Sequence, residues 1–178
     1  MRRKILAPVV AIALLFSAGT SLAQPQISSA DKAAFKDFQL TDEFITNYLG
    51  YSEEAAKKPC ELSPIMLLQN SDIEHQSLED TIKAFDKQPG VHETLQRHNL
   101  TARTMILGLG TLMGAAMQDI LNEHPELAQK GEMKTGATTS PENMAVYQHH
   151  KAAIQQHQME VARQQMQSRQ SGIFDCMK

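Results

Sequence analysis

Tryptophan is absent from this chain of 178 residues, and aromatic residues of all kinds make up only 5% of it. Sugars stack on the flat apolar faces of aromatic side chains, so this shortage argues against a carbohydrate-binding platform. Runs of β-branched residues are also rare, whereas alanine, glutamine, leucine and methionine are abundant. This balance favours helices over strands. The composition therefore predicts an all-α protein.

Familiar catalytic motifs are missing as well. The chain has no GxSxG nucleophile elbow, no HExxH zinc motif and no glycine-rich phosphate loop. It has no CxxCH, which excludes covalent c-type haem. Acidic residues do gather around His75 (Asp72, Glu74, Glu79 and Asp80), but such a cluster at the start of a helix is usually a solvated cap. The sequence therefore favours a protein that is not an enzyme.

Residues 1–23 have the pattern of a secretory signal peptide. Three basic residues come first, an apolar stretch follows, and a small-x-small site ends at Ala23. We expect cleavage after Ala23, which leaves one domain over residues 24–178. No cysteine follows the cut, so a lipid anchor is not indicated there. The short leader fits a bacterial periplasm best.

The charge balance limits the partners that this chain can have. Loss of the leader removes three of the 17 basic residues and none of the 20 acidic ones, which leaves a formal charge of −6. A mildly acidic surface argues against nucleic acid and anionic lipid as partners. No later apolar stretch reaches the length of about 20 residues that a bilayer requires. We therefore expect no transmembrane segment after signal cleavage.

The chain has two cysteines, Cys60 and Cys176. In an oxidising compartment an isolated pair of this kind is usually a disulfide. Neither cysteine has the CxxC spacing or the adjacent histidine that would indicate a metal site. We expect a Cys60–Cys176 disulfide that ties the tail, residues 170–178, back to the helical domain.

The stretch 100–123 is the most apolar part of the chain after the leader, and from Thr104 to Met117 it contains no charge. A helix that is apolar nearly all round must be covered by other helices or by lipid. These 14 residues, 104–117, are too few to span a bilayer. We therefore expect a single bundle of about five helices around this central helix, with Thr101 as its N-cap.

Three glycines lie inside the expected central helix. Gly108, Gly110 and Gly114 each cost about 1 kcal/mol relative to alanine. The GxxxG spacing of Gly110 and Gly114 predicts that a neighbouring helix backbone approaches closely there. The stretch is not a dinucleotide-binding fingerprint, because Met113 stands where the third glycine should be.

Capping residues place the other helices. Thr41 and Ser77 are expected N-caps, and Pro141 suits the first position of a helix. The composition of residues 129–140 predicts a loop. The expected helices lie at 30–39, 41–58, 77–88 and 91–100, and a long last helix spans 141–169.

The last helix carries the best candidates for a binding site. His150 and His157 lie seven residues apart on one helical face, with Ile154 between them and His149 beside the first. Histidines on one helix hold a metal best when they are four residues apart, so a second helix would have to supply a further ligand. The candidates are His92, His98, His124 and the methionines of the central helix, of which Met113 and Met117 lie one turn apart. The bound group could be zinc, copper or a loosely held haem. Two simpler interpretations stay open: the histidines are polar residues beside an apolar seam, and the methionines fill gaps in the core.

Within residues 77–117, Pro89 and Val91 stand on either side of Gly90, and Leu100-Thr101-Ala102-Arg103 begins a long apolar helix. With these features the stretch resembles the middle of a group of exported proteobacterial proteins of unknown function, in which Pro and Val are adjacent. The Pro141-Glu142-Asn143 start of the last helix also looks similar, so the match covers roughly two thirds of the mature chain. The resemblance implies an all-helical exported domain. It carries no known activity, so no catalytic residue can be transferred.

Three hypotheses of function follow from the sequence, of which the third is an enzyme whose reaction no motif identifies. The first is a non-enzymatic binding or envelope-maintenance protein of the periplasm, whose partner is a protein or a small apolar ligand held between helices. It predicts a cleft or an exposed apolar patch beside the central helix. The second is a metal- or haem-binding protein that uses His150 and His157. It predicts another ligand side chain close to these histidines.

Overall fold

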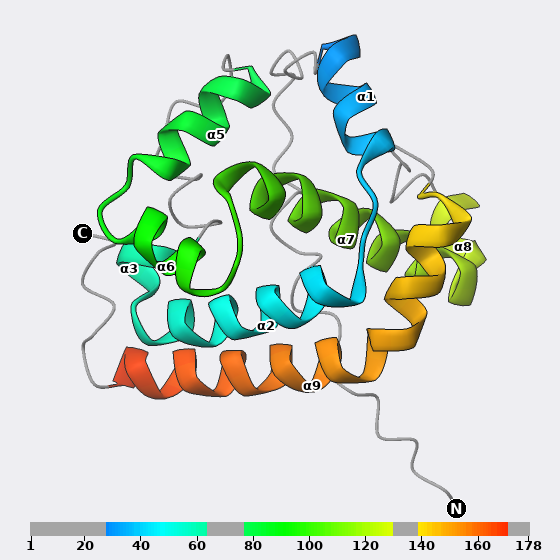
Figure 1. Ribbon diagram of the computed structural model, residues 1–178. Helices are drawn as coiled ribbons and strands as arrows, with labels where there is room; N and C mark the ends of the chain where they lie inside the picture. Colours follow the sequence, from blue (N-terminus) through cyan, green and yellow to red (C-terminus); the bar gives the residue numbers. More distant parts are fainter. Residues whose placement is uncertain (1–27, 64–76, 130–138, 171–178) are drawn as a thin grey trace, which may run out of the picture.

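Helices make up the folded part of the chain (Figure 1). The computed structural model describes residues 28–63, 77–129 and 139–170, and these ranges contain helices and no strands. In chain order the helices are α1 (Ser29–Asp37), α2 (Asp42–Lys57), α3 (Pro59–Leu62), α5 (Leu78–Asp86), α6 (Val91–Arg97), α7 (Ala102–Glu123), α8 (Pro125–Gln129) and α9 (Pro141–Gln170). The all-α fold expected from composition is confirmed.

Side-chain caps start several helices at the predicted positions. The hydroxyls of Thr41 and Ser77 accept hydrogen bonds from backbone N–H groups three residues further on, at 3.0 and 3.2 Å. Thr101 accepts from the backbone of Thr104, whose own hydroxyl accepts from the Thr101 N–H at 2.9 Å. This is a capping box in which threonine replaces the usual glutamate. Each such cap stabilises its helix by about 1 kcal/mol.

Most element boundaries fall where the sequence predicts them, within two or three residues. α2 ends at Lys57, and the short helix α3 begins at Pro59. Gly90 has a positive φ of 79°, which glycine adopts without strain, and it separates α5 from α6. The short helix α8 was not foreseen. Most of the predicted loop 129–140 lies outside the described residues.

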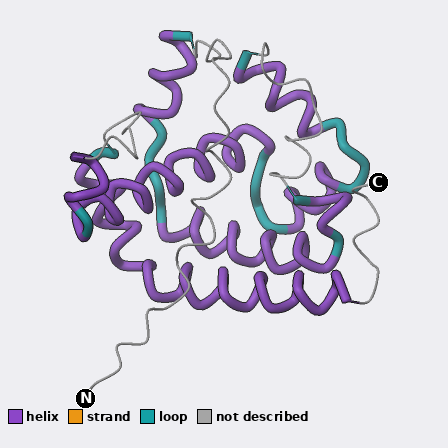
Figure 2. The backbone as a smooth tube through the Cα atoms, turned by 180° about the vertical axis from the view of Figure 1, so that it is seen from behind, coloured by secondary structure: helices purple, strands orange, loops and turns teal. Residues whose placement is uncertain are grey.

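The central position of α7 explains its apolar sequence. Figure 1 shows α7 crossing the middle of the molecule, with α1 and α5 on one side and α2 and α9 on the other. Met105 and Ala115 of α7 are fully buried. Seen from behind in Figure 2, α2 and the second part of α9 again run side by side, so their pairing is a real contact.

Contrary to the expectation from its uncharged run, α7 is long and apolar enough to cross a membrane by length and composition alone. Half of the residues in its most apolar window, however, are buried inside the protein. Core helices of globular proteins have the same length and composition. The burial therefore favours α7 as a core helix that the rest of the chain covers.

The glycines of α7 accommodate aromatic rings rather than a neighbouring backbone. A Cβ atom at Gly108 would lie 2.1 Å from the ring of Phe44 in α2, and one at Gly110 would lie 2.5 Å from the ring of Phe35 in α1. Gly114 faces the Thr139 hydroxyl, at 3.3 Å from such an atom. The prediction that two helix backbones cross at Gly110 and Gly114 is therefore wrong. The missing side chains of Gly108 and Gly110 instead leave two notches in the surface of α7, and each notch holds one aromatic ring. The rings fill the volume that side chains would otherwise occupy.

Gly108→Ala is expected to destabilise the protein by about 1–2 kcal/mol, although helix propensity alone would favour alanine by about 1 kcal/mol. The reason is that the Phe44 ring cannot move away easily. It is buried, and it packs edge-on against Phe38 and stacks with Tyr48, at ring-centre distances of 5.8 and 6.0 Å. Chemical denaturation of the purified variant gives the change in the free energy of unfolding.

Gly114→Ala is the matched control for this notch. Its new methyl group would meet only a rotatable hydroxyl, at 3.3 Å. The variant should be as stable as the parent or slightly more stable, since alanine is the better helix former. Equal losses at Gly108 and Gly114 would show that the Phe44 ring does not occupy the Gly108 notch.

Candidate functional site

The inner face of α9 carries a regular stripe of side chains, spaced three or four residues apart. The stripe consists of Asn143, Tyr147, His150, Ile154 and His157. Asn143, Tyr147 and Ile154 are buried, and the two histidines are partly buried. Both histidines that the sequence singled out therefore lie on the side of α9 that faces the protein.

Asn143 fixes α9 against the segment that leads into α2. Its amide oxygen accepts a hydrogen bond from the Leu40 N–H at 2.7 Å, and its amide nitrogen donates to the Phe38 carbonyl at 2.9 Å. His150 follows Asn143 after two helical turns, on the same face. This clamp therefore helps to bring His150 beside Asp42, the first residue of α2.

His150, His149 and Asp42 form a compact cluster. His150 Nε2 lies 2.8 Å from Asp42 Oδ1, and the two histidine rings meet edge to face with their centres 4.8 Å apart. One ligand atom from each of the three residues lies within 4.8 Å of the others. The His150 side chain is 19% exposed and that of Asp42 is 75% exposed, so the cluster opens to solvent on the α2 side.

His157 lies two turns further along α9 and is not part of this cluster. Its Nε2 atom is buried, and the structure gives it no hydrogen-bond partner. Burial lowers the pKa of His157, and the nearby Glu53 carboxylate opposes this only in part. The ring borders an open depression lined by residues of α9 itself, among them Met159 and Arg163. Of the two histidines that the sequence predicts as metal ligands, His150 lies beside two further possible ligands, His149 and Asp42, whereas His157 does not belong to this group.

His157→Leu should stabilise the protein by about 1 kcal/mol, because it removes a buried polar atom that lacks a partner. It should also weaken the acid sensitivity of folding. The pKa of His157 is lower in the folded state than in the unfolded state. Its contribution to the free energy of unfolding is therefore fully present above the ordinary pKa of about 6.5, and it is lost as the pH falls through the pKa of the folded state.

Urea unfolding at pH 7.5 and at pH 5.5 checks this prediction for His157. The parent should lose more stability over this interval than the variant does. Identical losses in the two proteins would mean that His157 is not held neutral by the fold.

The other described histidines pair with carboxylates elsewhere in the bundle. His92 lies 3.0 Å from Asp86, and His124 lies 3.2 Å from Glu126. His98 contacts Glu54 instead. Among the described residues, the cluster with metal-compatible spacing contains none of these three histidines. They therefore do not supply the second-helix ligand that the sequence hypothesis required.

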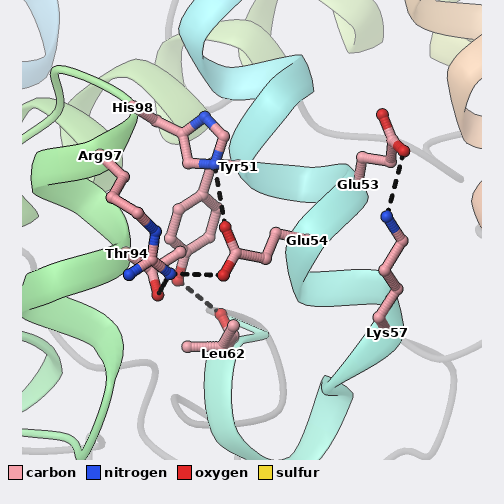
Figure 3. Close-up of polar contacts among 8 residues, drawn as sticks. All are labelled: Tyr51, Glu53, Glu54, Lys57, Leu62, Thr94, Arg97 and His98. Carbon is pink, nitrogen blue, oxygen red and sulfur yellow. Dashed lines mark hydrogen bonds and ion pairs between the residues drawn. The ribbon is translucent and has the colours of Figure 1, made fainter.

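Figure 3 shows the network around Glu54, which ties α2 to α6. One carboxylate oxygen of Glu54 accepts from Arg97 at 2.5 Å, and the other lies 3.2 Å from His98 Nε2. Burial raises the pKa of Glu54, but the hydrogen bonds from His98 and Arg97 outweigh it and hold the pKa below its ordinary value. Fully buried Tyr51 donates to the Leu62 carbonyl at 2.6 Å and so adds α3 to the same corner. Because these groups satisfy one another, we assign this network a structural role.

A second network, which joins α7 to α9, was not foreseen from the sequence. The buried Asp119 carboxylate accepts from Lys151 Nζ at 2.7 Å and from Gln148 at 2.5 Å. Lys151 also pairs with Glu123 at 2.6 Å, and hydrogen bonds to Asp119 and Glu123 raise the pKa of Lys151. Together these contacts hold the first half of α9 to the C-terminal end of α7.

A signal for Asp119 was present in the sequence. Asp119 follows Leu112 and Ala115 at helical spacing, so it falls on the buried stripe of α7. Asp119 is the first charged residue after the uncharged stretch that begins at Thr104. A lone acid on such a stripe indicates a partner from another helix, since a buried charge is costly when it is unpaired.

The methionines of α7 divide into two groups. Met105 is completely buried, as a residue that fills a gap in the core should be. Met113 and Met117, one turn apart, are instead 56% and 40% exposed. Two large apolar side chains of the central helix are therefore exposed, one turn apart.

Several predicted features lie outside the described residues and stay predictions. They are the leader over residues 1–23, His75 with the neighbouring acids Asp72 and Glu74, and Cys176 at the C-terminal end. The side chain of Cys60 is not described either. The position of the two cysteines therefore neither supports nor contradicts the Cys60–Cys176 disulfide.

Comparison with known proteins provides no relative from which a function can be transferred. No protein-family model matches the chain, and neither a curated protein nor a solved structure does so.

Proposed function

We propose that this chain is an exported, non-enzymatic binding or envelope-maintenance protein of the periplasm, and that its partner is another protein. The observation that carries the proposal is the exposure of Met113 and Met117 on α7, the most apolar helix. Exposed apolar patches mark interaction sites, and flexible, polarizable methionine adapts well to a partner surface.

The packing around α7 favours a protein partner over a small apolar ligand between the helices. The rings of Phe44 and Phe35 fill the notches at Gly108 and Gly110, where a small ligand would otherwise find room. The depression beside His157 is open and is lined by α9 alone, so it does not enclose a ligand between helices. A contact on the surface of α7 agrees better with both observations.

Export and oxidation complete the proposal. Residues 1–23 serve as a signal peptide that is cleaved after Ala23, and Cys60 pairs with Cys176 in the periplasm. The basic, apolar and small-residue segments of the leader support export. The even number of cysteines supports the disulfide, which would be stable in that compartment.

The intact mass of the protein tests export and the disulfide together. The full chain, expressed in a bacterium, should be recovered from the periplasmic fraction with a mass that begins at Gln24. Thiol alkylation of the denatured protein should add no label before reduction and two labels after it. Recovery of the uncut chain from the cytoplasm, or labelling before reduction, would contradict this part of the proposal.

Site-specific photo-crosslinking tests the proposed contact surface. A photo-reactive amino acid at position 113 or 117 should give an adduct of one defined mass in the producing cell. Met166 on α9 is the matched control, because it is 61% exposed and lies on a different helix. The same adduct from position 166, or no adduct from positions 113 and 117, would argue against α7 as the contact surface.

Metal binding by the last-helix histidines is the alternative function. The observation that favours it is the contact of His150 with His149 and Asp42. This arrangement suits a metal ion rather than haem, because one ligand atom from each of the three residues lies within 4.8 Å of the other two.

A further inference from the structure

We propose that Asp42, His149 and His150 form a binding site for a divalent transition-metal ion of the zinc, copper and nickel class. The three side chains come from two helices, and their ligand atoms lie within 4.8 Å of one another. The site does not depend on the proposed protein contact at Met113 and Met117, which lie on a third helix.

The donor set selects this class of metal. Imidazole nitrogen suits zinc, copper, iron and nickel, whereas magnesium and calcium prefer sites made of oxygen atoms alone. Two histidines and one carboxylate form a three-ligand set of the kind that zinc enzymes complete with water. Because Asp42 is largely exposed, water can reach the remaining coordination positions.

The geometry requires only small side-chain movements. Zinc bonds of about 2.0–2.1 Å at tetrahedral angles place ligand atoms about 3.3 Å apart. His150 Nε2 and Asp42 Oδ1 are already 2.8 Å apart, and the widest separation in the cluster is at most 4.8 Å. His149 and Asp42 are exposed, so rotation of these side chains closes the difference without repacking the core.

The surrounding structure holds the ligands in place. The Thr41 cap fixes the first turn of α2, where Asp42 lies, and buried Ile154 anchors α9 one turn after His150. The Asn143 clamp sets the register between these helices. The metal would take the place of the proton between His150 and Asp42 and would bridge α2 to α9. Such a bridge stabilises the folded state, because the unfolded chain does not bring these ligands together.

Zinc titration of the untagged full chain tests the site. The parent protein is first treated with a chelator, and the chelator is then removed. Calorimetry should show that each chain binds one zinc ion. His149→Ala and Asp42→Asn should each weaken binding at least about tenfold, since the loss of even a supporting group costs about 10–100-fold. Zinc should also raise the melting temperature of the parent, and it should do so less in both variants. Circular dichroism verifies that the variants fold.

His92→Gln is the matched control, because His92 forms a histidine–carboxylate pair with Asp86 at 3.0 Å and, among the residues that the structure describes, belongs to no group of three possible metal ligands. This variant should bind zinc as the parent does. Equal weakening by His92→Gln would show general binding to surface histidines and would overturn the proposal. An unchanged dissociation constant in His149→Ala and Asp42→Asn, or no zinc binding by the parent, would overturn it as well.

Discussion

Lys151→Met should lower the free energy of unfolding by about 3 kcal/mol. The substitution leaves the buried Asp119 carboxylate without the cation that lies 2.7 Å away, and an unpaired buried charge is strongly destabilising. Gln148 still donates a hydrogen bond to Asp119, but it brings no compensating charge. Glu123 loses its partner too, although it is exposed and contributes little. Urea denaturation measures the loss.

Two further variants make this result specific to the buried pair. Lys57→Met removes an exposed lysine that pairs with Glu53 at 3.3 Å, and it should change stability by less than about 0.5 kcal/mol. The double variant Asp119→Leu with Lys151→Met should recover much of the loss, because apolar residues often replace a buried ion pair at little cost. A double variant that is less stable than Lys151→Met alone would contradict a penalty that arises from the unpaired carboxylate.

Asn143→Leu should destabilise the protein by about 2–4 kcal/mol. The leucine cannot accept from the Leu40 N–H or donate to the Phe38 carbonyl, so both backbone groups lose their partners. Leaving a buried donor or acceptor unsatisfied costs about 1–3 kcal/mol for each group. The same change frees α9 from the segment before α2, so native-state proteolysis should also become faster in this corner. Thermal and urea unfolding give the magnitude.

Asn122→Leu is the control for this prediction. Asn122 lies on α7 and is exposed, so its replacement should change stability by less than about 0.5 kcal/mol. If Asn143→Leu were as stable as Asn122→Leu, the amide of Asn143 would not be clamping the two segments.

The helix starts could be predicted because their causes are local. Thr41, Ser77 and Thr101 satisfy backbone groups only three residues away, so the capping residue and its partner appear together in the sequence. The buried face of α9 could also be predicted from the sequence, because His150, Ile154 and His157 repeat at the helical period. In both cases the chain neighbours decide the outcome.

The candidate site depended on a contact that the sequence does not display. Asp42 and His150 are separated by 108 positions, and only the packing of α2 against α9 brings them together. From the sequence alone, Asp42 was an acid in the first turn of a helix, where it also favours the helix dipole. A residue with such a sufficient local explanation gives no sign of a second, distant contact.

The glycines of α7 show the same limit in the core. Their number inside an apolar helix correctly indicated that something approaches closely. The spacing of Gly110 and Gly114 suggested a helix backbone, because that pattern is common at helix crossings. The structure places an aromatic ring at Gly108 and another at Gly110 instead. The group that packs against each glycine is determined by the partner helices, so the glycine pattern alone does not predict it.

The central physical feature of this protein is the burial of α7 inside its own chain. Native-state hydrogen exchange measured residue by residue tests it most directly. The amides of residues 105–112 should exchange only through global unfolding, with a protection free energy equal to the free energy of unfolding from denaturation. Exchange of these amides as fast as that of exposed helical residues near the end of α9 would contradict a core built around α7.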